Sequence, residues 1–335
     1  MTQTNHAWKL ASRPVGLPTR DTWDYTEEPV GQPGDGEVLV EVAFASLDPA
    51  MRGWMNDVAS YVPPVAIGEV MRALGVGRVV ASSFEGLEPG DHVSGLLGIQ
   101  ELAVVPGAGV QKFDPSGAPL PVFLSALGMT GMTAYFGLLD IGEPEPGQTV
   151  VVSGAAGAVG QIVGQIAKVK GCRAIGIAGG ADKCRTVVED YGFDACIDYK
   201  GENVMAKLGE HCPDGIDVYF DNVGGDILDA ALAHLARNAR VVICGAISQY
   251  NETGAVKGPA NYLSLLVKHA SMTGFVVSDY IARWGEGVTQ MAQWLGEGKV
   301  TSREDVVKGL ETFPETFLRL FSGENQGKLV LEVAG

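Results

Sequence analysis

The sequence contains little of what a metal centre or a disulfide framework needs. Its 335 residues include only five cysteines and five histidines. None of the cysteines forms a C-x-x-C pair, which disfavours a zinc knuckle, and the scattered histidines are expected to be solvated or structural. An odd number of cysteines indicates reduced thiols, most of which are expected to be small buried residues.

Basic residues and long apolar runs are also scarce. Lys and Arg number 24 against 40 Asp and Glu, and the resulting net charge of −16 disfavours binding to nucleic acid, whose phosphates would be repelled. No apolar run reaches the roughly 20 residues of a membrane helix, and the N-terminal MTQTNHAWKLASRP lacks the apolar core of a signal peptide. With 46% apolar residues, the sequence predicts a cytoplasmic protein long enough for two domains, without nucleic-acid or membrane partners.

The stretch around which the chain is organised is residues 148–171, QTVVVSGAAGAVGQIVGQIAKVKG. It predicts a strand over 149–153, a turn containing Gly154, Gly157 and Gly160, and a helix from about Val159. Such a turn directs backbone N–H groups and the positive end of the helix dipole at one place. The spacing G-x-x-G-x-x-G departs from G-x-G-x-x-G, and a tight turn without a ligand is the alternative. The flanking strand and helix favour dinucleotide binding, with the pyrophosphate at the glycines.

The chain changes character near residue 123. Before it, strands are predicted at 37–45, 73–81, 91–97 and 100–105, which indicates a β-rich, barrel-like domain with loops at 46–55 and 60–69. After a predicted helix at 125–139, strands alternate with helices, and strands are expected at 149–152, 173–177, 195–198, 215–222, 239–244 and 271–277. This alternation predicts an α/β fold with a doubly wound parallel sheet of about six strands. Helices at 280–299 and 306–320, the latter broken near Pro314, and a strand at 327–333 complete the chain.

The residues after the second predicted strand bear on which dinucleotide is bound. An NAD site places Asp or Glu there for the ribose 2′-hydroxyl, whereas a 2′-phosphate requires positive charge and backbone donors. This chain has Gly179 and Gly180, followed by Asp182, Lys183 and Arg185. The pattern favours NADP. A helix start with Asp182 near the N-cap is the alternative, but it leaves the glycine pair unexplained.

Six motifs together carry a family resemblance that spans nearly the whole chain. They are GAAGAVG, AGGADKC, DYK at 198–200, DNVGG at 221–225, CGAISQYN at 244–251 and GENQGK at 323–328. With them the chain resembles the zinc-independent medium-chain dehydrogenase/reductases, and among these the prostaglandin reductase and curcumin reductase group of NADPH-dependent reductases of conjugated double bonds.

The resemblance implies a GroES-like catalytic domain over residues 1–122, completed by 301–335, and an NADP-binding Rossmann domain over 123–300, with the active site in the cleft between them and a homodimer as the assembly. It assigns Gly157, Ala158, Val159 and Gly160 to the pyrophosphate, and Lys183 and Tyr199 to the phosphorylated ribose. The other cofactor-binding residues that it implies, several of them beside the nicotinamide, are Met129, Thr130, Asn222, Cys244, Gly245, Ala246, Ile247, Ser248, Tyr250, Phe275, Val276, Val277 and Asn325.

The scarcity of metal ligands agrees with this resemblance. A zinc alcohol dehydrogenase needs Cys or carboxylate, His and Cys ligands, but no cysteine precedes Cys172, and His92 is the only histidine in the first domain after His6. Ordinary alcohol–ketone hydride transfer then loses its usual stabilisation of the alkoxide. Reduction of an α,β-unsaturated carbonyl remains feasible, since hydride addition at the β-carbon leaves an enolate that hydrogen bonds stabilise. We therefore expect a 2-alkenal or enone reductase; a quinone reductase and a non-catalytic NADP-binding protein are the alternatives.

Tyr61 and Tyr250 are the candidate catalytic residues. A phenol can donate a hydrogen bond to an enolate oxygen or relay a proton, although either ring could simply pack. Some prostaglandin reductases have a tyrosine eight residues before the phenylalanine of the FVV motif, where this chain has Val267. The proton could therefore come from Tyr61, from Tyr250 or from solvent.

Overall fold

The structure is a computed structural model that describes residues 4–333. Within this range the chain forms two compact units. Residues 4–124, 304–325 and 329–333 make up the first unit, and residues 125–303 with 326–328 make up the second. Each unit has its own buried apolar core. None of the helices in the described range is long and apolar enough to cross a lipid bilayer.

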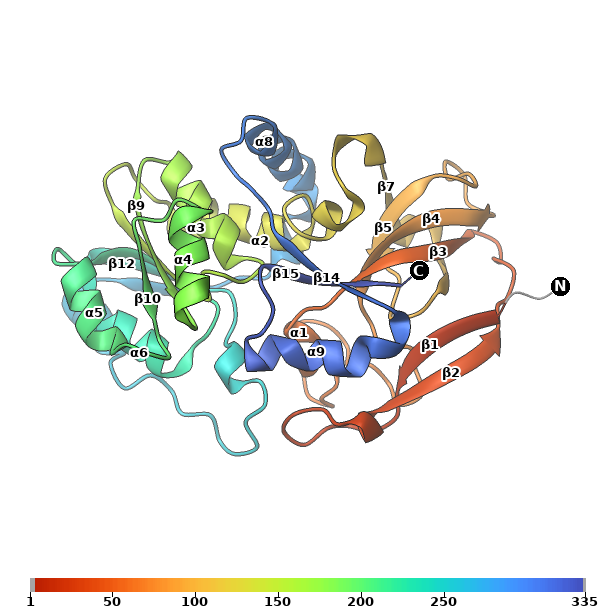
Figure 1. Cartoon of the computed structure of the whole chain (residues 1–335), viewed down its shortest axis with the longest axis horizontal. Helices are drawn as coiled ribbons and strands as arrows, with labels where there is room; N and C mark the ends of the chain where they lie inside the picture. The colour runs from red at the N-terminus through yellow and green to blue at the C-terminus, as the bar shows by residue number, and fades with distance from the viewer. Residues whose placement is uncertain (1–3, 334–335) are drawn as a thin grey trace. The chain divides into compact units, whose positions relative to one another are not determined.

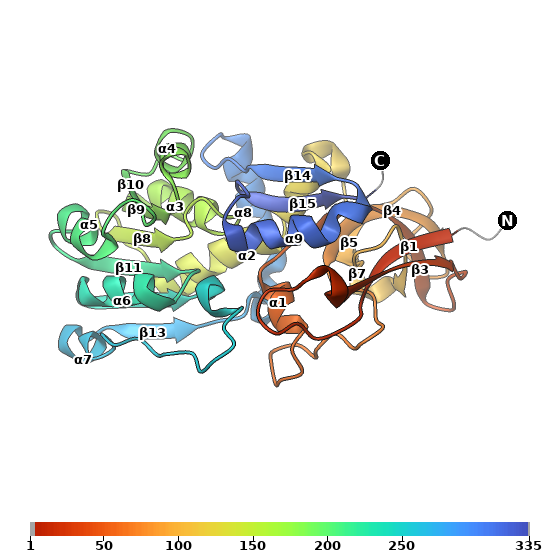
Figure 2. The same ribbon diagram turned by 60° about the horizontal axis from the view of Figure 1, so that its bottom comes forward.

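The second unit is built on a parallel sheet, with β10 and β13 at its edges (Figure 2). Among the described residues the sheet has six strands in the order β10-β9-β8-β11-β12-β13, and all neighbouring pairs are parallel. The strands are β8 (Thr149–Ser153), β9 (Arg173–Ala178), β10 (Ala195–Asp198), β11 (Ile216–Asp221), β12 (Leu235–Ile243) and β13 (Ser271–Gly274). From β8 the chain runs outward to β10 and then returns to β11 on the other side of β8. The doubly wound sheet predicted from the sequence is confirmed, and its order reverses between β8 and β11, where ligands of such sheets bind.

Helices connect these strands and bury their faces. Val150, Val151 and Val152 of β8 have no exposed surface, as expected for a central parallel strand that is covered on both sides. The helices of this unit are α2 (Met129–Phe136), which continues as a π-helical segment (Gly137–Gly142), α3 (Gly160–Val169), α4 (Ala181–Glu189), α5 (Val204–His211), α6 (Gly225–Ala233), α7 (Ser264–Lys268) and α8 (Trp284–Gly296).

The first unit is β-rich, as predicted. Its main sheet has, among the described residues, the order β14-β15-β3-β4-β5-β7, with β6 also paired to β3, and a separate antiparallel pair joins β1 to β2. The strands are β1 (Thr4–Leu10), β2 (Trp23–Pro29), β3 (Glu37–Ser46), β4 (Leu74–Ser82), β5 (His92–Leu96), β6 (Leu102–Pro106), β7 (Val110–Phe113), β14 (Glu304–Lys308) and β15 (Lys328–Glu332). Helices α1 (Ala50–Trp54) and α9 (Phe313–Ser322) also belong to this unit.

Aromatic packing joins the end of the chain to its beginning within the first unit. Helix α9 lies beside the β1–β2 pair (Figure 1), where the rings of Trp23 and Phe313 meet edge to face with centroids 4.9 Å apart. The indole N–H of Trp8 donates a 2.7 Å hydrogen bond to the carbonyl oxygen of Leu310. Both tryptophans are buried, so residues after 304 complete the core that the first strands begin.

Several local predictions were wrong in extent or type, among them the strand expected over 239–244, which begins at Leu235. The segment 46–55, expected to be a loop, contains α1, and the strand expected over 271–277 ends at Gly274. The helix expected over 125–139 begins at Met129 and becomes π-helical at Gly137. Pro314 does not break a helix but lies in the first turn of α9, where its missing N–H costs nothing, and the residues before it form β14.

Candidate functional site

The turn after β8 is packed too tightly for side chains at its last glycine. A Cβ atom on Gly160 would lie 2.3 Å from the carbonyl oxygen of Gly154, whose own φ is +62°. The backbone N–H of Gly157 donates to the same carbonyl at 2.9 Å. This turn leads directly into α3, whose first N–H groups and dipole therefore face outward beyond the carboxyl end of β8. The geometry suits a phosphate group.

A segment from near the end of the chain lies against this turn. Gly327 forms a parallel bridge with Gly157, and its N–H donates to the carbonyl oxygen of Ala156 at 3.0 Å. A Cβ on Gly327 would lie 2.1 Å from the carbonyl oxygen of Arg303, so this position also requires glycine. The GENQGK motif thus contributes Gly327 to the turn, and the predicted cofactor residue Asn325 precedes it by two positions.

Two buried glutamines of α3 fix the segment that Gly327 touches. The side chain of Gln161 accepts from the Arg303 N–H at 3.2 Å, and that of Gln165 accepts from the Thr301 N–H at 2.8 Å. The amide of Gln165 also donates to the Thr301 carbonyl at 2.9 Å. Both glutamines are fully or nearly fully buried, and the sequence reading missed them because amphipathic periodicity does not show which polar side chain turns inward.

The ends of β9 and β10 bring the predicted 2′-phosphate residues together. A Cβ on Gly179 would lie 2.8 Å from the hydroxyl oxygen of Tyr199, so the absent side chain makes room for the tyrosine ring. Gly180 has a φ of +99°, and its N–H donates to Asp198 Oδ1 at 2.7 Å. Lys183 is partly buried in the first turn of α4. These positions place a cation and a phenol beside two glycines.

The carboxylate of Asp182 would repel a phosphate at this position, but it is paired with a neighbouring cation. Asp182 Oδ1 lies 3.1 Å from a guanidinium nitrogen of Arg185, one turn further along α4, and both side chains are largely exposed. Such a surface pair contributes little to stability. It does, however, partly neutralise the negative charge next to Lys183.

A buried carboxylate network, not predicted from the sequence, holds the end of β11. Asp221 Oδ1 accepts from the hydroxyls of Ser153 at 2.8 Å and Tyr219 at 3.0 Å, and from the N–H groups of Val223 at 3.1 Å and Gly224 at 3.0 Å. Burial raises the pKa of Asp221 above its ordinary value, although these donors oppose the shift. In the sequence, only the position of Asp221 next to Asn222 in the DNVGG motif indicated that it belongs to the site.

The same network positions Asn222. Its N–H donates to Ser153 Oγ at 2.8 Å, and its side-chain amide donates to the Ser153 carbonyl at 2.8 Å. The side chain is therefore fixed at the point where β8 and β11 end side by side. This is the reversal of strand order, where a dinucleotide is expected to cross the sheet.

The loop after β12 folds back on the β11 loop. The N–H groups of Cys244 and Gly245 donate to the Asp221 carbonyl at 2.9 and 3.1 Å, and Ser248 Oγ donates to the Val223 carbonyl at 2.6 Å. Burial raises the pKa of the Cys244 thiol to about 12, so it stays protonated at neutral pH. The predicted residues Cys244, Gly245, Ala246, Ile247 and Ser248 thus lie beside Asn222 on one loop layer.

Tyr250 turns its hydroxyl toward the same loop. The oxygen accepts from the Ala246 N–H at 3.1 Å, and a Cβ on Gly245 would lie 2.9 Å from it. Accepting this bond polarises the phenol and strengthens it as a donor. The position is compatible with a role in shaping the loop and with a role in proton donation.

Residues predicted to flank the nicotinamide lie on two elements of the second unit. The ring of Phe275 packs against Phe220, with centroids 6.5 Å apart, and occupies the space left by Gly137. Val277 is buried, and Val276 precedes it at the start of a 3-10 helix (Val277–Arg283). Met129 begins α2, where the hydroxyl of Thr130 donates to the Ser125 carbonyl at 3.1 Å.

Tyr61 lies in the first unit, in the loop between α1 and β4. Its side chain is 60% exposed, and its hydroxyl oxygen accepts a long hydrogen bond, 3.4 Å, from the indole N–H of Trp54. The guanidinium of Arg72 lies over the Trp54 ring, 5.7 Å from its centroid. The loop therefore presents a phenol that is held by one weak contact. Across residues 4–333, no cluster of three or more His, Cys, Asp or Glu side chains could hold a metal ion.

Two protein-family models match the chain. One, described as the N-terminal domain of oxidoreductase, matches residues 6–113, and the other, described as zinc-binding dehydrogenase, matches residues 158–294. The NADPH-dependent curcumin reductase of Escherichia coli (strain K12) is 44% identical over 338 residues, which cover 99% of this chain and 98% of that protein. The 2-alkenal reductase (NADP(+)-dependent) of Nicotiana tabacum is 40% identical over 304 residues, covering 90% and 88%. The crystal structure of CurA in complex with NADPH from Vibrio vulnificus superposes with a TM-score of 0.93 at 44% identity, covering 98% of this chain and 99% of that one.

Proposed function

Since the chain belongs to the medium-chain dehydrogenase/reductase family, in the group of NADP-dependent oxidoreductases that includes curcumin and prostaglandin reductases, we propose that it reduces the conjugated C=C bond of α,β-unsaturated carbonyl compounds. It is an NADP-dependent oxidoreductase with NADP(H) as its cofactor. The observation that carries the proposed reaction is the 40% identity to a 2-alkenal reductase, because a 2-alkenal is an α,β-unsaturated aldehyde.

The glycine-lined edge of the sheet fits the cofactor. A side chain at Gly160 would clash with the backbone of the turn after β8, and one at Gly179 would displace the ring of Tyr199. Glycine at these two positions therefore keeps the start of α3 and the Tyr199 phenol in place for the phosphate groups of the cofactor. We assign the pyrophosphate to residues 157–160, where α3 begins, and the 2′-phosphate to Lys183 and Tyr199. When bound, NADPH supplies the hydride for the β-carbon of the substrate.

The remaining cofactor contacts follow the loop layer around Asn222. In this proposal the amide of Asn222, held by Ser153, and the backbone of the loop after β12 border the dinucleotide where the strand order reverses. The nicotinamide end is bordered by residues from α2 and from the segment after β13. The residues assigned are Met129, Thr130, Asn222, Cys244, Gly245, Ala246, Ile247, Ser248, Tyr250, Phe275, Val276, Val277 and Asn325.

The chain's own catalytic contribution would be hydrogen bonding to the substrate oxygen. An enolate oxygen needs a neutral donor whose proton stays in place at neutral pH, and a phenol meets that need. Tyr250 is favoured because its hydroxyl already accepts from the Ala246 N–H, which strengthens it as a donor. Tyr61 is the second candidate because its exposed hydroxyl is held only by the 3.4 Å contact with Trp54.

We propose that this activity needs no zinc. The sequence supports this proposal because no cysteine precedes Cys172 and the zinc ligands of alcohol dehydrogenases are therefore missing from the first domain. Treatment of the purified enzyme with a zinc chelator, followed by elemental analysis, should leave NADPH turnover unchanged in metal-free protein. Loss of activity that added zinc restores would overturn this part of the proposal.

We also propose a homodimer formed through the β13 edge of the second unit. The strand β13 ends the sheet and its residues are all exposed, as are several apolar side chains of the neighbouring α7 region. Leu266 and Val267 are 74% and 69% exposed, which favours coverage by a second copy. Light scattering should give twice the chain mass, and Leu266→Glu should yield monomer; a monomeric wild type would contradict the proposal.

The experiment that tests the function measures the fall in NADPH absorbance with a panel of 2-alkenals, cyclic and aryl enones, and quinones. Turnover of alkenals and enones, with NADH as a poor substitute, is the expected result. Preferential turnover of quinones would favour the rival quinone reductase. NADPH binding without turnover of any acceptor would instead indicate a non-catalytic NADP-binding protein.

A further inference from the structure

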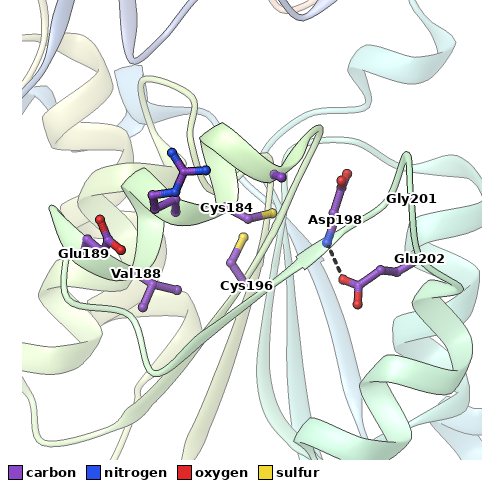
Figure 3. A pocket seen from close by; sticks show the side chains of 9 residues that line it. Cys184, Val188, Glu189, Cys196, Asp198, Gly201 and Glu202 are labelled. Carbon is purple, nitrogen blue, oxygen red and sulfur yellow. Dashed lines mark hydrogen bonds between the residues drawn. The ribbon is translucent and has the colours of Figure 1, made fainter.

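Two thiols face each other at the outer edge of the parallel sheet. Cys184 lies in the first half of α4, and Cys196 lies on the edge strand β10 that packs beneath this helix. Their sulfur atoms point toward one another (Figure 3) and are close enough to share a hydrogen bond. The two residues belong to one compact unit, so their proximity does not depend on any movement between units.

The pair is accessible, whereas Cys172 and Cys212 of the same unit are buried. Both thiols line an open pocket of about 630 Å³, together with Val188, Asp198 and Glu202. Both residues are partly exposed, and within the described residues none of the cysteines is in a disulfide. A small polar oxidant can therefore reach the pair from solvent.

A glycine of β9, Gly176, packs against Cys196 and against Val187 of α4. A Cβ on Gly176 of β9 would lie 3.2 Å from the sulfur of Cys196 and 2.8 Å from a methyl group of Val187. The absent side chain lets the sulfur of Cys196 lie against β9 while α4 packs above it. The sulfur is thus held under the helix that carries its partner, which favours formation of a disulfide between the two residues.

The two thiols differ in acidity. The hydrogen bond from Cys196 lowers the pKa of the Cys184 thiol below its ordinary value, whereas the same hydrogen bond, with burial, raises the pKa of Cys196. Cys184 therefore carries the thiolate character of the pair. A thiolate next to a protonated thiol has the arrangement of an attacking and a resolving cysteine.

We propose that Cys184 and Cys196 form a redox modification site, in which a hydroperoxide converts the two thiols to a reversible intrachain disulfide between α4 and β10. The Cys184 thiolate attacks the terminal oxygen of the peroxide, the O–O bond breaks, and a sulfenic acid forms as the alkoxide or hydroxide leaves and takes a proton. The sulfur of Cys196 then attacks the sulfenic sulfur, the S–S bond forms, and water leaves with the thiol proton. Two electrons pass from the thiols to the peroxide.

The disulfide would act on the neighbouring 2′-phosphate residues. Lys183 precedes Cys184 in the chain, and Tyr199 follows Cys196 by three positions on the same strand end. Drawing the two sulfurs to bonding distance pulls the first turn of α4 toward β10, and this displaces Lys183 relative to Tyr199 and Gly179. This consequence rests on the proposed NADPH function, and it predicts weaker binding of NADPH in the oxidised protein, with little change for NADH.

The chemical test uses the full chain and does not depend on activity. Protein treated with hydrogen peroxide is alkylated, and the remaining thiols are counted by intact mass and peptide mapping, before and after dithiothreitol. The wild type should lose two alkylatable thiols, and mapping should join Cys184 to Cys196. Cys184→Ser and Cys196→Ser should abolish this linkage, whereas Cys212→Ala, which changes a buried cysteine of the same unit, should retain it.

Binding of NADPH and NADH to the reduced and oxidised proteins, measured by titration, tests the consequence. Oxidation should raise the NADPH dissociation constant by roughly 5-fold or more, reversibly, in the wild type and in Cys212→Ala only. Five alkylatable thiols after peroxide treatment, or a sulfinic acid at Cys184 without the linkage, would overturn the site. Formation of the disulfide with unchanged NADPH affinity would overturn its effect. Failure of the reduced protein to bind NADPH would instead count against the proposed cofactor function, and the thiol count would still decide the chemical proposal.

Discussion

Replacing Lys183 by alanine should convert a preference for NADPH into near indifference between NADPH and NADH. Lys183 is partly buried in the first turn of α4, which begins directly after Gly179 and Gly180, and the ring of Tyr199 packs at Gly179. In the proposed site its ammonium group neutralises the 2′-phosphate, which NADH lacks. The substitution should therefore weaken NADPH binding and leave NADH binding unchanged.

The expected loss of NADPH affinity is that of one charge-assisted hydrogen bond, from the Lys183 ammonium group to the 2′-phosphate. Such a bond contributes about 1.5–3 kcal/mol, and about 1.4 kcal/mol corresponds to a factor of ten in a dissociation constant. Because Lys183 is partly exposed to solvent, the lower end of this range applies. We expect the NADPH dissociation constant to rise by roughly 10-fold.

Fluorescence titration with both nucleotides measures the effect directly. Lys168→Ala is the matched control, because Lys168 lies in the same unit, in the last turn of α3 at the other end of that helix from Gly160, and is paired with Asp194 at 2.8 Å. Equal weakening of NADPH and NADH binding by Lys183→Ala would mean a structural role for the lysine. An unchanged NADPH affinity would refute the assignment of the 2′-phosphate to this position.

Three other substitutions test separate parts of the site. Gly160→Ala places a Cβ 2.3 Å from the Gly154 carbonyl; it should destabilise the fold by about 1–3 kcal/mol in denaturant titrations and weaken NADPH binding, and a fully stable variant would contradict the packing argument. Burial raises the pKa of Asp221, so the folded chain holds that proton more tightly than the unfolded chain, and the resulting stability is lost as pH rises through the raised pKa. The free energy of unfolding of the wild type minus that of Asp221→Asn should therefore fall with pH over that window, whereas a difference constant from about pH 4 to pH 8 would refute the shift. Tyr250→Phe should lower kcat for an enone by about 100-fold, and full activity in both Tyr250→Phe and Tyr61→Phe would leave solvent as the proton source.

The sequence predicted most reliably what local patterns determine. The run from Thr149 to Gly160 indicated a strand, a turn and a helix, because glycines and apolar periodicity follow from the geometry of adjacent residues. Alternation of strands and helices was sufficient for the parallel sheet, since right-handed connections leave few topologies. The six spaced motifs added the family, which sequence comparison confirmed.

Such local patterns could not predict contacts between residues that are far apart in the sequence. The hydrogen bond from Ser153 to Asp221 joins residues 68 positions apart, and the Gln165 contact with Thr301 spans 136. Neither residue type nor spacing marks these partners. The strand β1 was missed for the same reason: Trp8 is buried by Phe313, from the other end of the chain.

The measurement that tests the proposed reaction most directly follows the position of the transferred hydrogen. An enone is incubated with the enzyme and NADPH that carries deuterium at the transferable position, and the product is analysed by nuclear magnetic resonance. The proposed function predicts a saturated carbonyl product with deuterium at the β-carbon and hydrogen from solvent at the α-carbon. Deuterium at the carbonyl carbon of an allylic alcohol would contradict it.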